Sequence, residues 1–134
     1  MYSKILVPVS LAADRNTARA FEVAQHLAGD TGEIHAVHVM EVVPSFSEAY
    51  VPERLRLEME EKSKAAFMEL VPDVTASSET LHGSPGTMIL KHAQDIGADC
   101  IVVASHRPEF SDYLLGSTAA RVVRHATCAV HVIR

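Results

Sequence analysis

The sequence contains no tryptophan, only two cysteines and no excess of positive charge. The formal net charge of −5 argues against a nucleic-acid-binding protein, because such proteins carry clustered basic side chains. No apolar run approaches the roughly 20 residues that a helix needs to cross a bilayer, so we expect no membrane insertion. The first residues lack the long apolar segment of a signal peptide, and we therefore expect a cytoplasmic protein.

The two cysteines, Cys100 and Cys128, fall in segments that have the pattern of buried strands. One interpretation is a pair of reduced core residues, and the other is a disulfide or a metal-binding pair. No spacing of cysteine and histidine matches a known zinc motif. His35 and His38 are expected on opposite sides of one strand, where they cannot bind the same ion. We therefore expect no metal site.

Short β-branched runs alternate with longer amphipathic segments along the 134 residues. Such alternation indicates a parallel sheet with helices on both faces, and right-handed crossovers make it a doubly wound α/β sheet. A chain of this length suits a single domain, residues 1–134. The expected strands are 4–9, 34–43, 74–81, 99–105 and 129–133, and the expected helices are 14–28, 53–70, 85–96 and 117–125.

Individual residues refine this arrangement. Pro8 is expected at the end of its strand, because proline cannot donate a hydrogen bond to a central ladder. Ser84, Pro85 and Gly97 have the identities typical of an N-cap, a first helical residue and a helix stop. The polar, alternating strand 74–81 is expected near one edge of the sheet, and the last strand at the other.

An open doubly wound sheet binds ligands outside the carboxyl ends of its strands. Residues 8–10, 39–40 and 104–106 lie at three such ends, and a helix begins at 116–118. The free N–H groups and the positive dipole of a helix N-terminus favour an anion, and two hydroxyls add donors there. The alternative interpretation is that Ser117 is only an N-cap.

The segments KILVPV, GSP at 83–85, DCIVVAS and LLGSTAARVVRHATCAVHVI resemble the universal stress protein family over nearly the whole chain. The block ASHRPxxxxYLLG is similar to the F and G type subgroup. The resemblance implies a Rossmann-like, adenine nucleotide alpha hydrolase-like sheet with five parallel strands in the order 3-2-1-4-5. It also implies a regulatory protein rather than an enzyme, with slow ATP hydrolysis left open.

The phosphate loop departs from the family pattern G-x2-G-x9-G-[ST] of ATP-binding members. Ala104 and Arg107 stand at the first two glycine positions, and the spacer before Gly116 is one residue shorter. Ser10 stands where such members have an aspartate that contacts adenine. Arg107 offers a charged, bidentate phosphate donor in place of a backbone amide, so the sequence favours a modified anion site over a lost one.

The ligand implied by the resemblance is ATP or a related adenine nucleotide, with or without Mg²⁺. Adenine and ribose are expected at one group of residues and the phosphates at another. His106 either contacts phosphate or has a structural role. The expected contacts are Pro8, Val9, Ser10, Val39 and Gly83 on the first side, and Val103, Ala104, Ser105, His106, Arg107, Gly116, Ser117 and Thr118 on the second.

Other interpretations remain open. The altered residues Ser10, Ala104 and Arg107 also suit a nucleotide-free interaction module, whereas a phosphoanhydride hydrolase would need a metal-ligand set that the sequence does not offer. Residues 44–62 are either a solvated helix face or a lid or partner surface. Pairing of strand 129–133 with its twin would give a homodimer, with a tetramer as the alternative and a regulatory protein as a further partner.

Overall fold

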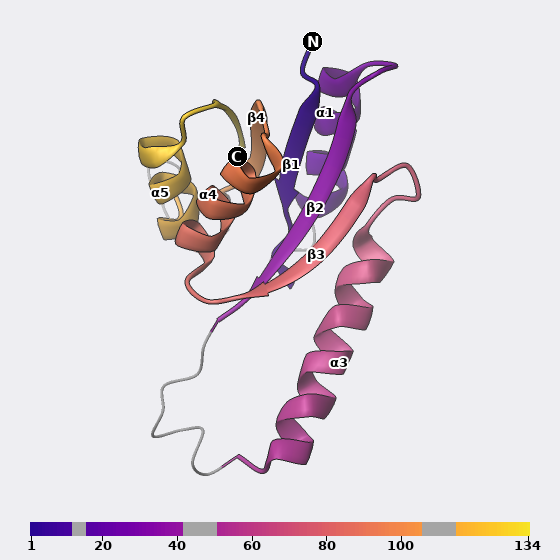
Figure 1. The fold of residues 1–134 in the computed structure, drawn as a ribbon, viewed down its shortest axis with the longest axis vertical. Coiled ribbons are helices and arrows are strands. Elements are labelled where there is room, and N and C mark those ends of the chain that lie inside the picture. The colour runs from indigo at the N-terminus through magenta and orange to yellow at the C-terminus, as the bar shows by residue number, and fades with distance from the viewer. Residues whose placement is uncertain (12–15, 42–50, 106–114) are drawn as a thin grey trace.

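The computed structural model describes residues 1–11, 16–41, 51–105 and 115–134, which form a five-stranded parallel sheet flanked by helices (Figure 1). The strand order β3-β2-β1-β4-β5 confirms the predicted fold class and order. The elements are β1 (Lys4–Pro8), α1 (Thr17–Ala28), β2 (Glu33–Met40), α3 (Glu53–Leu70), β3 (Ser77–His82), α4 (Pro85–Ile96), β4 (Cys100–Ala104), α5 (Ser117–His125) and β5 (Ala129–Ile133).

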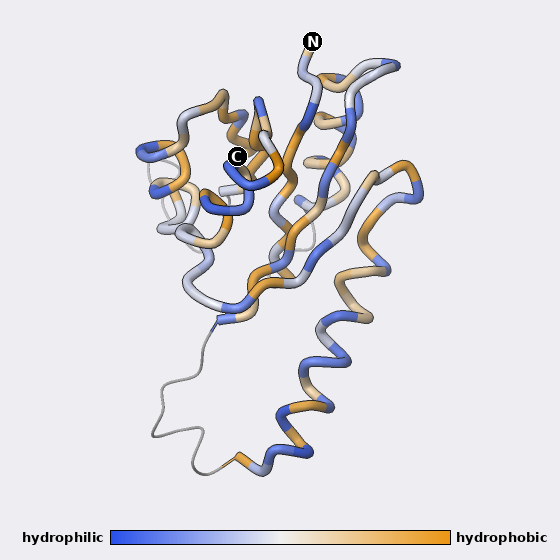
Figure 2. The backbone as a smooth tube through the Cα atoms, viewed as in Figure 1, coloured by the Kyte–Doolittle hydropathy of each residue, from blue (hydrophilic) through white to orange (hydrophobic). Residues whose placement is uncertain are grey.

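The sheet separates two hydrophobic clusters, because successive side chains of a strand point to opposite faces. In β1, Ile5 and Val7 pack against α1 and α3, whereas Leu6 packs against α4 and α5. The strands β1 and β4 are buried on both faces, and the apolar colouring of β1 in Figure 2 reflects this. This arrangement explains why the central strands are nearly continuous apolar runs.

Helix α3 is attached to the sheet mainly by its C-terminal half, and its N-terminal half extends past the ends of the strands (Figure 1). Phe67 is the only side chain of this helix that is fully buried. Leu55, Leu57 and Met59 are each about half exposed or more, at 47%, 49% and 59%. The described part of the predicted segment 44–62 is thus exposed, which suits both a solvated helix face and a lid or partner surface, and residues 44–50 lie outside the described segments.

The observed strand boundaries differ from the predicted ones at a few positions. The third strand begins at Ser77 rather than at residue 74, because Thr75 N–H closes a turn onto Pro72 O at 3.1 Å. The first strand ends at Pro8 rather than at residue 9, in line with the expected place of the proline at a strand end, although Val9 N–H still donates to Val37 O at 2.8 Å. Both β3 and β5 lie at edges, as their positions in the predicted order require.

A tight turn connects α1 to β2 and brings the start of β1 beside it. Gly32 N–H donates to Ala28 O at 3.0 Å, and Glu33 N–H donates to Ser3 O at 2.8 Å. An added Cβ at Gly32 would lie 2.6 Å from Ala28 O and against Tyr2 O. The turn therefore requires glycine for steric reasons.

Among the described residues, none of the helices is both apolar and long enough to pass through a membrane.

Candidate functional site

The carboxyl edge of the sheet brings together the ends of β1, β2, β3 and β4 and the start of α5. Pro8 ends β1 opposite Val37 of β2, and Ser10 follows as an exposed residue. Val39 pairs with Leu81 in the next strand and packs against the α4–α5 side of the core. The predicted adenine-side residues therefore lie at one edge of the sheet.

His38 organises the end of β1, a role that sequence reasoning missed. Its Nδ1 lies 2.9 Å from Val9 O, and because a carbonyl only accepts, Nδ1 carries the hydrogen. The ring also contacts Phe67 of α3, with centroids 5.7 Å apart and planes inclined by 32°. From the sequence, only its place in the second predicted strand, on the side opposite to His35, was apparent. His35 has different partners, Ser77 Oγ at 2.6 Å and the Glu33 carboxylate at 3.0 Å.

Gly83 links β3 to α4 at the same edge. Its N–H donates to Met40 O at 2.9 Å, and its φ of +141° is a conformation that other residues rarely adopt. A Cβ at this position would lie 2.9 Å from Met88 Cγ. Ser84 occupies the predicted N-cap position and Pro85 follows it, but the Ser84 side chain makes no capping hydrogen bond.

Ser105, one of the predicted phosphate-side residues, is directed toward the neighbouring strand. Its N–H and its hydroxyl both donate to Ile133 O, at 2.9 and 3.3 Å. The side chain is 9% exposed, so it contributes little surface to a ligand. Val103 is also buried, whereas Ala104 is partly exposed at the end of β4.

The start of α5 lies directly beside the end of β4. Gly116 is the N-cap of this helix, and a Cβ added there would lie 3.5 Å from Ser105 O. The alternative interpretation of Ser117 as the N-cap is wrong, because Ser117 is already the first helical residue. Gly116 has no side chain with which to cap the helix, the first turn contains no acidic residue, and among the described residues no side chain bonds the first N–H groups, an arrangement that favours an anion.

Two predicted contacts, His106 and Arg107, lie outside the described residues, and their position is a prediction from the sequence only.

A cavity of about 560 Å³ opens between the end of β2 and the N-terminal half of α3. Among the described residues, Val39 is the only predicted site residue that lines it. Across it, His82 Nε2 lies 3.4 Å from the Glu60 carboxylate and links β3 to α3. The lining residues are His38, Val39, Met40, Glu41, Val51, Arg56, Met59, Glu60, Ser63 and His82.

The two cysteines are free thiols on opposite faces of the sheet. Cys100 begins β4 on the α1 side, whereas Cys128 lies before β5, on the α4–α5 side, and is only half-buried. Burial, with smaller contributions from Cys128 and Asp99, raises the pKa of Cys100 to about 11. The two thiols are not joined in this structure, and within the described segments no three His, Cys, Asp or Glu side chains form a metal-binding group.

Comparisons with known proteins agree with this geometry. The family model described as "Universal stress protein family" matches residues 1–134. Universal stress protein G of Shigella flexneri is 32% identical over 142 aligned positions, which cover 100% of both chains. The solved structure of the universal stress protein UspA from Lactobacillus plantarum has a TM-score of 0.72 and 26% identity, covering 99% of this chain and 98% of that one.

A second solved structure contains a nucleotide. The universal stress protein from Archaeoglobus fulgidus in complex with dAMP has a TM-score of 0.58 and 23% identity, and the match covers 99% of this chain and 98% of that one. At this identity the likeness establishes the shared fold.

Proposed function

This chain belongs to the universal stress protein family, and we propose that residues 1–134 form one cytoplasmic domain that binds ATP or a related adenine nucleotide as a regulatory ligand. The observation that carries the proposal is the uncapped N-terminus of α5 beside the end of β4. Its first N–H groups, which no described side chain caps, would form an anion site with the hydroxyls of Ser117 and Thr118 at the edge where doubly wound sheets bind ligands.

The remaining site residues fit around this anion site. Adenine and ribose would contact the end of β1 and the partly exposed Val39, near the Gly83 turn. The phosphates would lie over the end of β4 and residues 116–118. The dAMP complex of the Archaeoglobus fulgidus protein supports an adenine nucleotide as the ligand class. We propose binding with at most slow hydrolysis, with or without Mg²⁺.

Equilibrium dialysis of the purified protein tests the proposal directly. We expect saturable binding of ATP in the micromolar to millimolar range, and mass spectrometry should detect adenine nucleotide in protein purified without added ligand. A protein that binds no nucleotide up to millimolar ATP would contradict the proposal and favour a nucleotide-free interaction module.

Arg107→Ala is expected to weaken ATP binding by about 10- to 100-fold, the effect of losing one charge-assisted phosphate contact. Adenosine, which has no phosphate, should bind the variant as tightly as the wild type. Arg124→Ala is the matched control, because Arg124 lies in the last turn of α5, at the other end of the helix. If the variant lost equal affinity for ATP and for adenosine, Arg107 would not be a phosphate-binding residue.

We also propose a homodimer that pairs β5 with β5 of a second copy, since β5 is an edge strand. Ser105 N–H donates to Ile133 O, so the backbone groups of Ile133 face β4 and those of Val132, one residue earlier, face the free edge.

Val132→Pro is expected to convert the dimer to a monomer, because it removes an N–H that faces the free edge. His131→Pro is the control, since it removes an N–H that faces β4. It should lower the melting temperature more than Val132→Pro does. Analytical ultracentrifugation gives the mass, and a wild-type monomer would contradict the dimer. A wild-type mass of four chains would instead indicate a tetramer.

A further inference from the structure

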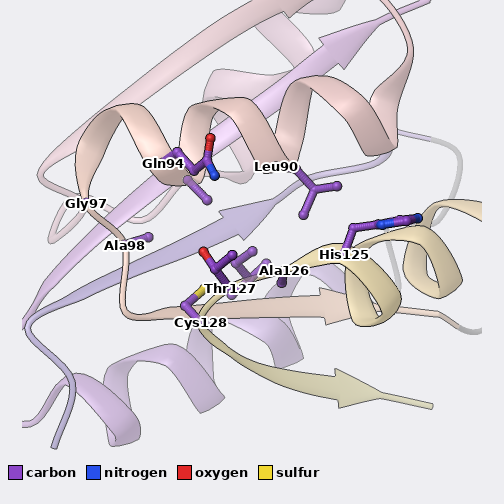
Figure 3. A pocket seen from close by; sticks show the side chains of 10 residues that line it. Leu90, Gln94, Gly97, Ala98, His125, Ala126, Thr127 and Cys128 are labelled. Carbon is purple, nitrogen blue, oxygen red and sulfur yellow. The ribbon is translucent and has the colours of Figure 1, made fainter.

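Two surfaces outside the proposed nucleotide site differ in the apolar area that they expose. The cavity of about 300 Å³ between the C-terminal ends of α4 and α5 is lined by Ala93 and Ile101, which are buried, and by the polar Gln94 and Thr127 (Figure 3). The N-terminal half of α3, residues 53–61, instead carries leucine and methionine side chains that are about half exposed or more (Figure 2). This half projects past the ends of the strands, so its apolar groups face solvent (Figure 1).

Leu55 and Met59 lie on the same side of this half. A helix turns by about 100° per residue, so two residues four positions apart are only about 40° from each other around the helix axis. Leu57 lies roughly 160° away from both, on the other side of the helix. Leu55 and Met59 thus share one exposed surface, the Leu55–Met59 face.

Charged side chains border this face on both sides, in the same order of signs. One border carries Arg54 and Glu58, whose Nε and Oε1 atoms are 3.5 Å apart. The other border carries Arg56 and Glu60. On each border the arginine comes first and the glutamate follows four residues later. The Leu55–Met59 face is therefore basic at its N-terminal end and acidic at its C-terminal end.

The two arginines stand at the end of the helix that disfavours them. Arg54 and Arg56 are in the first turns of α3, where the positive end of the helix dipole stabilises carboxylates rather than cations. Ion pairs within the chain offset this only weakly, because Arg56 lies 3.8 Å from the Glu53 carboxylate and the Arg54 side chain is 92% exposed. These charges suit a partner that brings carboxylates to this end of the helix.

An antiparallel second copy of α3 would cover this face. A two-fold axis at the level of Leu57 would place Leu55 of each copy opposite Met59 of the other, so that both copies use the same patch. Since residues 53–61 lie beyond the strands, the two helices could overlap there while their sheets stay at opposite ends of the pair (Figure 1). Phe67, which anchors α3 to the sheet, is ten residues from this axis, or about 15 Å along the helix, and stays outside the overlap.

The antiparallel orientation also matches the charges. Arg54 would meet Glu58 of the second copy on one border, and Arg56 would meet Glu60 of the second copy on the other, each pair within about 3 Å along the axis. The Glu60 carboxylate is already positioned by His82, whose Nε2 lies 3.4 Å from it. A parallel pair would instead set arginine against arginine and glutamate against glutamate, so the charges select one orientation.

We propose that the Leu55–Met59 face is a self-association surface, at which two copies of this chain pair through α3 in antiparallel orientation, separately from the pairing of β5. The surface is small and its ion pairs are exposed, so the pairing is weak, with a dissociation constant of roughly 0.1 to 1 mM. Together with β5 it gives each chain two self-complementary interfaces, from which a tetramer or a longer assembly is built.

Complementary charge variants test the pairing in the Val132→Pro chain, in which β5 does not contribute. Arg54→Glu/Arg56→Glu makes the whole face acidic, and Glu58→Arg/Glu60→Arg makes it basic, so neither variant should pair with itself. A one-to-one mixture should associate, because every contact between the two then joins opposite charges. In sedimentation equilibrium at up to about 1 mM protein, each variant should self-associate at least about tenfold more weakly than the parent, and the mixture should recover the parent's affinity.

A second pair of variants locates the surface on the helix. Leu55→Asp should weaken self-association by about tenfold, because it places a carboxylate in the centre of the contact. Leu57→Asp is the matched control, since Leu57 is equally exposed but lies on the other side of the helix, and it should leave the association unchanged. Circular dichroism shows whether each variant is folded.

If Val132→Pro does not fold, the same charge variants in the wild-type chain decide the question, since their mixture should then be heavier than either variant alone. A parent chain that stays monomeric at about 1 mM, a mixture no heavier than its components, or equal effects of Leu55→Asp and Leu57→Asp would each overturn the proposal.

Discussion

Phe67→Ala should lower the free energy of unfolding by about 3 to 5 kcal/mol, the range measured for buried phenylalanine. Phe67 is 1% exposed and is the only fully buried side chain of α3. It also packs against the His38 ring, which holds Val9 O at the end of β1. The substitution therefore removes apolar burial, leaves a cavity and releases the support of the proposed nucleotide site.

Urea denaturation followed by circular dichroism measures this effect. Leu57→Ala is the matched control in the same helix, since Leu57 is 49% exposed and its loss should change stability by only about 0.5 kcal/mol. If Phe67→Ala were no more destabilising than Leu57→Ala, α3 would not be anchored to the sheet in the way described. Loss of nucleotide affinity without a loss of stability would likewise contradict this account.

Gly32→Ala should destabilise the protein by about 3 kcal/mol, although it adds only one methyl group. The new Cβ would meet backbone atoms, with Ala28 O at 2.6 Å and Ala28 Cα at 2.8 Å, and would press against Tyr2 O. Backbone atoms cannot rotate away as a side chain does. Relief therefore requires a shift of the turn that joins α1, β1 and β2.

Gly97→Ala separates this steric effect from the general cost of replacing glycine. Gly97 has a φ of +71° with no heavy atom within 4 Å of an added Cβ, so only backbone strain of about 1 kcal/mol is expected there. Thermal and chemical denaturation should rank the Gly32 variant well below the Gly97 variant. The reverse ranking would show that the backbone around Gly32 can shift at little cost in free energy.

The sheet could be predicted from the sequence because its determinants are local. Residues 100–104 form an apolar run that is buried on both faces, and such a run has few alternatives to a central parallel strand. Pro85 and Gly97 fix the two ends of α4, and the observed helix runs between them. The parallel arrangement then follows from the alternation of elements, and the resemblance to the family supplied the order of the strands in the sheet.

The site was less predictable because its details depend on contacts between distant residues. The sequence does not show that the Ser105 hydroxyl turns toward Ile133 O, or that His38 reaches back to Val9 O. Ser117 was an equally good N-cap by residue type, but in the structure the cap is Gly116, one residue earlier.

The division of the core by the sheet has a consequence for how substitutions combine. Ile5 and Val7 contact one cluster and Leu6 the other, so the two clusters communicate only through the strand backbones. Free-energy changes at sites that share no neighbours are usually additive, and changes on the two faces should therefore be nearly independent. The α4–α5 side can thus diversify its residues while the α1–α3 side continues to support the fold.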